Sequence, residues 1–130
     1  MRDIFVLLVI YQLKHFFADF PLQGHYMLGK FKGGTEWIRP LAAHAAVHAA
    51  FTFGISLWFV WNMTGTKSLI PFPLAILDFV VHFCVDRLKA SPALGGRWKM
   101  DKPQFWWALG ADQMVHHLTH YFIIWKLVTL

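Results

Sequence analysis

The segment IRPLAAHAAVHAAFTFGISLWFVW, residues 38–61, decides the fold. It exceeds the roughly 20 residues that an α-helix needs to cross a bilayer. Its only charged residue is Arg39, and Pro40 beside it suits the first turn of a helix, where a missing N–H costs little. The same segment carries His44 and His48, which share one helical face because they are four residues apart. We therefore predict a transmembrane helix that bears a polar stripe.

Three further apolar stretches flank this segment, and turn-forming residues separate them. We predict helices at about 4–20, 69–88 and 105–128 in addition to 38–61. The composition agrees, because 57% of the 130 residues are hydrophobic and 15% are charged, against roughly 45–50% and 25% in an average soluble domain. We predict a single all-α domain over residues 1–130, a polytopic membrane protein whose four transmembrane helices form an antiparallel bundle.

The basic residues predict the orientation of this bundle. Eight of the 12 Lys and Arg residues flank or lie within the two long connections: Lys30, Lys32, Arg39, Arg87, Lys89, Arg97, Lys99 and Lys102. Positive-inside bias places these loops in the cytoplasm and both termini outside, in a bacterial inner membrane. We interpret Lys14 as snorkelling toward the headgroups. The expected partners are the lipid bilayer and an anionic lipid or phosphate-bearing substrate, with no nucleic acid; an oligomer is compatible with the sequence.

Ionisable side chains recur within the predicted spans. Each costs on the order of 2.5–3.5 kcal/mol at the centre of a spanning helix, so we expect them to face the bundle interior. Every helix presents one pair spaced by four residues: His15 with Asp19, His44 with His48, His82 with Asp86, and Asp112 with His116. Antiparallel connection brings all four pairs near the cytoplasmic end, so the sequence predicts one polar cluster there.

Imidazole and carboxylate groups together favour a divalent transition metal. We predict one or two ions, zinc first with Fe or Mn as alternatives, and all eight paired residues as candidate ligands. Asp19 and Asp112 are also the candidate catalytic bases. The single cysteine, Cys84, excludes a CxxC site and falls opposite His82 on its helix. Candidate outer partners of the metal or substrate contacts are Gln12, Gln23, Asp78, Lys89, Gln113 and His120.

The four motifs also resemble a known family. They are HFFADFPLQ at 15–23, HAAVH at 44–48, HFCVDRLK at 82–89 and DQMVH at 112–116. In this order they resemble a family of short bacterial and phage membrane proteins catalogued as a domain of unknown function. The chain is similar, more distantly, to a family described as membrane-bound metal-dependent hydrolases. This resemblance implies that the eight paired residues are functional, with Gln23, Lys89 and Gln113 as companions.

The leading hypothesis is a metal-dependent hydrolase that acts on a lipid, or on a phosphate or acyl ester, at the cytoplasmic membrane face. A divalent metal transporter or sensor is an alternative, because the HxxxD pairs resemble the zinc sites of cation-diffusion exporters. A non-enzymatic membrane interaction protein is another, with the polar stripes forming a metal-free hydrogen-bond network. A redox role is the last, since HAAVH and HHLTH, at 116–120, resemble the histidine boxes of di-iron desaturases.

Overall fold

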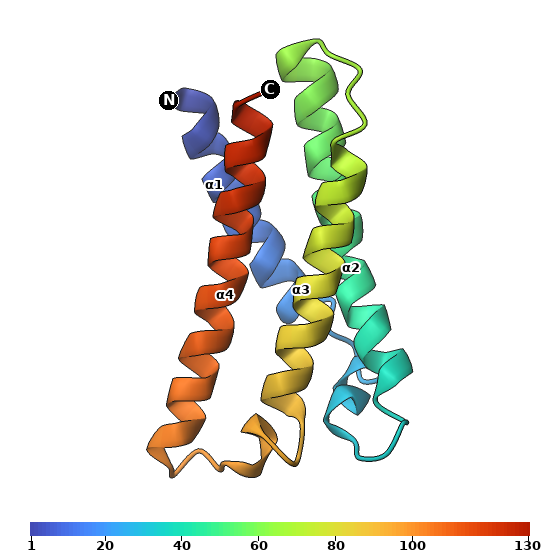
Figure 1. Cartoon of the computed structure of the whole chain (residues 1–130), viewed down its shortest axis with the longest axis vertical. Helices are drawn as coiled ribbons and strands as arrows, with labels where there is room; N and C mark the ends of the chain where they lie inside the picture. Colours follow the sequence, from blue (N-terminus) through green and yellow to red (C-terminus); the bar gives the residue numbers. More distant parts are fainter.

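A computed structural model describes all 130 residues of the chain. Its long helices alternate in direction, so that the two termini lie together at one end and the two long connections at the other (Figure 1). It contains no strands, which confirms the all-α class, and no boundary of a long helix differs from its predicted position by more than two residues. The long helices are α1 (Arg2–Asp19), α2 (Ile38–Phe59), α3 (Pro71–Ala90) and α4 (Pro103–Val128).

Three short elements complete the chain: the 3₁₀ turns η1 (Met27–Phe31) and η3 (Gly95–Arg97), and a π-helical turn, η2 (Val60–Thr64), that extends α2. The connection that contains η1 folds back against the start of α2. Gly29 permits this approach, because a Cβ atom there would lie 2.8 Å from Pro40 Cγ. Only glycine leaves room for the two segments to pack so closely.

Arg87 of α3 fastens the η1 segment to the bundle. Its Nη1 donates to the carbonyl oxygens of Lys30, at 3.4 Å, and Lys32, at 3.3 Å. Its guanidinium also lies 3.9 Å from the centre of the Trp37 ring, a cation–π contact. The η1 segment therefore closes over one end of the helices.

The interior of the bundle is unusually polar. Of the 29 buried residues, 14 are polar or charged, whereas large apolar side chains such as Phe72 and Trp107 are exposed on the outer faces. Cys84 is exposed. Six of the eight histidines are buried inside, namely His15, His44, His48, His82, His116 and His120.

The interior divides into two regions along the bundle axis. We call the apolar region near the termini the terminal core; its buried members are Leu7, Tyr11, Phe59, Val60, Leu74, Ile123, Ile124 and Leu127. The region toward the long connections holds the buried histidines and the Asp residues that contact them, and we call it the polar cluster. The four helices run continuously through both regions.

One helix, the stretch Ile38–Thr64 formed by α2 and η2, is long and apolar enough to cross a membrane by length and composition. The other long helices carry more ionisable residues, such as Lys14, Asp78 and His116, which raise their charge or lower their hydropathy. The four-span topology therefore stays a prediction.

Candidate metal centre

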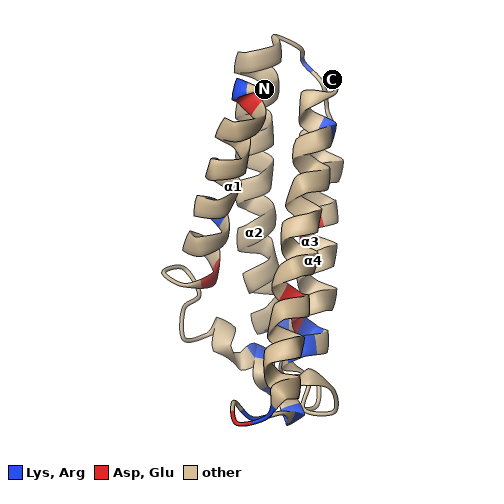
Figure 2. Cartoon of the chain, turned by 90° about the vertical axis from the view of Figure 1, so that its left-hand side faces the viewer, with Lys and Arg blue, Asp and Glu red and all other residues tan.

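All eight predicted ligands meet in the polar cluster. Each long helix contributes two of them, and all are buried except Asp19, which is half-buried. Apart from the one beside the N-terminus, the acidic segments lie in the part of the bundle away from the termini (Figure 2). Four sets of three residues have ligand atoms within 4.8 Å of one another: His15, His48, His82; Asp19, His44, His48; Asp78, His82, His120; and Asp86, Asp112, His116.

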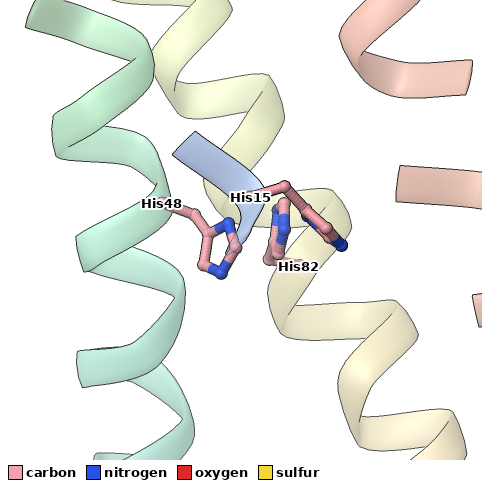
Figure 3. Close-up of side chains that lie close together, drawn as sticks. All are labelled: His15, His48 and His82. Atoms are coloured by element: carbon pink, nitrogen blue, oxygen red, sulfur yellow. The ribbon is translucent and has the colours of Figure 1, made fainter. Parts of the chain in front are cut away.

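Three imidazoles from three helices converge in the first set. His15 of α1, His48 of α2 and His82 of α3 lie side by side (Figure 3). The rings of His48 and His82 stack with centroids 3.7 Å apart, and the ring of His15 lies 5.8 Å from that of His48. One ring nitrogen of each histidine lies within 4.8 Å of a nitrogen of the other two, so the set is a candidate for holding an ion.

Asp78 fixes the orientation of His82. The Nδ1 atom of His82 lies 3.0 Å from the carbonyl oxygen of Asp78 and 3.1 Å from its Oδ1. We assign the ring proton to Nδ1 on the strength of these two acceptors. The Nε2 atom has no hydrogen-bond partner in the protein. A histidine held through one nitrogen by a carboxylate presents the lone pair of the other to a metal.

Asp19 joins the imidazoles of α1 and α2. Its Oδ1 lies 3.0 Å from His48 Nε2 and 3.3 Å from His44 Nε2, and its Oδ2 lies 3.1 Å from His15 Nε2. Asp86 of α3 approaches the other side of His44 Nε2 at 3.2 Å. One imidazole therefore lies between two carboxylates, an arrangement that couples the ligand sets into one network.

A third ligand set lies between α3 and α4. His116 Nε2 is 3.6 Å from Asp86 Oδ1, and His116 Nδ1 is 3.9 Å from Asp112 Oδ1. Lysines hold the opposite oxygens, since Lys30 donates to Asp86 Oδ2 at 2.7 Å and Lys89 to Asp112 Oδ2 at 2.9 Å. Each carboxylate thus directs its Oδ1 toward His116.

Lys30 is a site residue that the sequence did not reveal. In the sequence it is one of the basic loop residues that predict the orientation of the bundle in the membrane. In the structure it is only 7% exposed, because η1 returns over the end of the bundle and carries it to Asp86. No spacing rule connects a loop lysine to a carboxylate on another helix, so only the folded chain shows this contact.

The structure shows that the snorkelling prediction for Lys14 is wrong. Its side chain is buried and pairs with Asp78 Oδ2 at 2.7 Å; its Nζ also lies 3.1 Å from His120 Nε2. Thr52 donates to the same Asp78 oxygen at 2.6 Å. The burial has a simple reason, because Lys14 is on the interior face with Tyr11, three residues before it. That spacing was the overlooked signal.

The other predicted outer partners differ in position. Gln113 belongs to the cluster. Its Oε1 accepts a hydrogen bond from His15 Nε2 at 3.0 Å, and its Nε2 donates one to Asp112 Oδ2 at 3.0 Å. Gln12 does not belong to the cluster, because it is exposed and its Nε2 lies 3.3 Å from Nδ1 of His117. Gln12 lies three residues before His15, but its side chain turns to the outer face between α1 and α4.

Several buried polar atoms of the cluster have no hydrogen-bond partner in the protein. Among them are His82 Nε2, both ring nitrogens of His116 and Asp112 Oδ1. Buried polar groups are nearly always paired, so these atoms are free to contact a metal ion or water molecules. Nitrogen and carboxylate atoms gathered in this way fit a divalent transition ion.

Comparison with known proteins places the chain in a family. A family model described as "Protein of unknown function (DUF3307)" matches residues 4–130. The chain belongs to this family. The resemblance to a domain of unknown function is thereby confirmed, while the more distant likeness to metal-dependent hydrolases stays a prediction. No curated protein and no solved structure matches the chain.

A cavity of about 440 Å³ gives this DUF3307 chain an opening to the polar cluster. Its wall combines carboxylates, lysines and amides with three apolar side chains. The lining residues are Asp19, Phe20, Gln23, Lys30, Phe31, Asp86, Lys89, Leu109, Asp112 and Gln113. Three of the predicted ligands and three predicted outer partners therefore border a space of the size that holds a small ligand or a headgroup.

Proposed function

We propose that this chain is a membrane-embedded hydrolase that uses a divalent metal, zinc first, to cleave an ester at the cytoplasmic face. One observation carries the proposal: the ligand cluster of four helices borders an open cavity at the end of the bundle that is rich in Lys and Arg (Figure 2). The candidate ligands, an opening and basic residues that could contact an anionic substrate occur together at this end.

The distribution of tryptophan supports four membrane spans. Trp106 and Trp107 are exposed near the start of α4, at the end with the long connections. Trp58, Trp61 and Trp125 are exposed near the opposite end. Aromatic belts of this kind mark the two membrane–water interfaces. Of the ionisable residues that lower the hydropathy of α1, α3 and α4, Lys14, Asp78 and His116 are buried in the interior, so they do not meet lipid.

The chemistry requires an activated water and a base. A divalent ion bound there would lower the pKa of its water to about 7 and would so supply a nucleophile at neutral pH. Asp112 is positioned to take a proton, because Lys89 and Gln113 occupy its Oδ2 and leave its Oδ1 facing the cluster. We propose Asp112 as the principal general base, with its Oδ1 left uncoordinated and the ion held by the other ligands, and Asp19 as the second candidate because it also borders the cavity.

The terminal core disfavours transport as the function. A transporter must open its ion site to both sides of the membrane, whereas Leu7, Ile123 and Leu127 are fully buried in the apolar end of the bundle. The polar cluster has a lined opening at the other end. One-sided access of this kind suits a hydrolase.

The test uses protein purified in detergent, with its metal content measured by mass spectrometry. Bound zinc should accompany cleavage of at least one phosphate or acyl ester from a panel of chromogenic esters and phospholipids. The Asp112→Asn variant should lose about 10²–10⁴-fold in rate. Asp101→Asn is the matched control, because Asp101 is exposed at the same end. Metal-free protein, or an Asp112→Asn variant as fast as the parent, would overturn the proposal.

The orientation has its own test. A C-terminal alkaline phosphatase fusion should be active and a green fluorescent protein fusion dark, because the C-terminus is proposed to lie outside. The reverse result would exclude the proposed orientation.

A further inference from the structure

The cavity contains two ammonium groups with donors to spare: that of Lys30, which is buried, and that of Lys89, which is partly buried. Lys30 Nζ contacts Asp86 at 2.7 Å, and Lys89 Nζ contacts Asp112 at 2.9 Å. An ammonium group has three N–H donors, and each lysine uses one of them on a carboxylate. Both side chains line the cavity. Their remaining donors are therefore placed to bind an anion that enters it.

The charges of the cavity wall make anion binding depend on the metal. Three carboxylates and two lysines line the space: Asp19, Asp86, Asp112, Lys30 and Lys89. Their formal sum is one negative charge, which disfavours an anion. A divalent cation held by the carboxylates and histidines changes that sum to one positive charge. Because the groups are largely buried, this change of sign acts with little screening by solvent.

An apolar wall adjoins the charged groups. Phe20 and Phe31 are exposed at the rim and Leu109 of α4 is partly buried. The opening therefore lies where the end of α1, the η1 segment and α4 meet. A ligand with a charged head and an apolar remainder fits both surfaces.

We propose that this cavity binds a phosphate ester through Lys30 and Lys89, and that binding requires the divalent cation. This inference rests on the metal site of the proposed function and specifies phosphate, in place of an acyl ester, as the substrate chemistry. The phosphate oxygens accept hydrogen bonds from the two ammonium groups. A lipid headgroup and a water-soluble phosphoester share this chemistry.

Titration calorimetry on the full chain in detergent tests the inference. The probes are inorganic phosphate and dihexanoyl phosphatidic acid, each added to zinc-loaded protein and to protein in EDTA, with dihexanoylglycerol as the phosphate-free control. Phosphate should bind the zinc-loaded protein at least about 10-fold more tightly than it binds the protein in EDTA. A further gain for dihexanoyl phosphatidic acid assigns the site to a lipid headgroup, and equal affinities assign it to a soluble phosphoester.

Variants separate the lysines from the surrounding charge. Lys89→Gln and Lys30→Met should each weaken phosphate binding by about 10-fold or more, while Lys30→Arg retains it. Lys32→Met is the matched control, because Lys32 lies two residues away but is exposed and pairs with Glu36. Zinc binding by each variant verifies that the cluster is intact.

The outcomes distinguish this inference from the proposed function. The inference is overturned if zinc-loaded protein binds no phosphate. It is also overturned if the Lys30→Met and Lys89→Gln variants both bind phosphate as tightly as the parent. Either result holds even if an acyl ester is cleaved. Phosphate binding without hydrolysis of any ester overturns the proposed function and leaves the inference standing.

Discussion

The terminal core and the polar cluster occupy the same four helices but follow opposite rules. On α4 a single interior face runs from Asp112 through His116 and His120 to Ile123 and Leu127, all buried. The buried face of α4 is therefore continuous, while its side chains change from ionisable to apolar within about one turn. The comparison indicates that the terminal core stabilises the bundle through apolar packing, while the polar cluster holds the candidate metal ligands. An unevenly built interior of this kind lets a small bundle hold ionisable groups close together.

The boundary between the two regions is the ion pair of Lys14 and Asp78. Tyr11 lies beside it on the apolar side, with its hydroxyl 3.3 Å from Ser56 Oγ and its ring 5.2 Å from that of His120. On the other side Asp78 orients His82. Substitutions at the boundary and in each region test whether the division is real.

The largest effect should follow from breaking the boundary pair. Lys14→Ala leaves Asp78 buried without its cation, which should cost about 3–5 kcal/mol of the free energy of unfolding. Denaturant unfolding in detergent, followed by circular dichroism, measures it. The double variant Lys14→Met, Asp78→Leu should recover much of the loss because no charge stays unpaired. Equal losses in the single and double variants would show that the pair is not an electrostatic boundary.

A cavity in the terminal core should affect stability alone. Leu127→Ala removes a fully buried side chain and should cost about 2–5 kcal/mol. Zinc affinity measured at a temperature where the variant is folded should stay within about twofold of the parent. A large loss of zinc affinity would mean that the two regions are coupled and that the comparison fails.

Metal should stabilise the chain through the polar cluster. At a free zinc concentration 100 times the Kd, binding to the folded state adds about 2.7 kcal/mol. The rise in Tm on adding zinc measures this, and EDTA should reverse it. His116→Ala should lose most of the gain, since neither ring nitrogen has a hydrogen-bond partner in the protein and both are free to contact the ion. If zinc raises the Tm of His116→Ala as much as that of the parent, His116 is not a zinc ligand.

The smallest effect is expected outside both regions. Cys84 is exposed on α3, roughly opposite His82. Cys84→Ala should change the free energy of unfolding by no more than about 0.5 kcal/mol and leave zinc binding unaltered. A larger change in either quantity would show that the outer face of α3 takes part in a contact within the protein.

The sequence predicted the helices and most of the interior face because both follow from local periodicity. The pairs spaced by four residues, such as His44 with His48, lie together inside the bundle. Gln12 shows the limit of the method. It is near the predicted stripe, yet it is exposed and its Nε2 lies 3.3 Å from Nδ1 of His117, because the packing of α1 against α4, and not the spacing within α1, decides which positions at the edge of the stripe are covered.

By itself the sequence determined the class of fold, the four helices, and the concentration of histidine and carboxylate on their inward faces. Each of these depends on residues within a few positions of one another. Only the tertiary structure decided that Lys30 reaches Asp86, that Lys14 pairs with Asp78, and that the terminal core lies opposite the opening. These contacts join residues far apart in the chain, and their formation depends on how η1 folds back and how the helices pack, which no local pattern specifies.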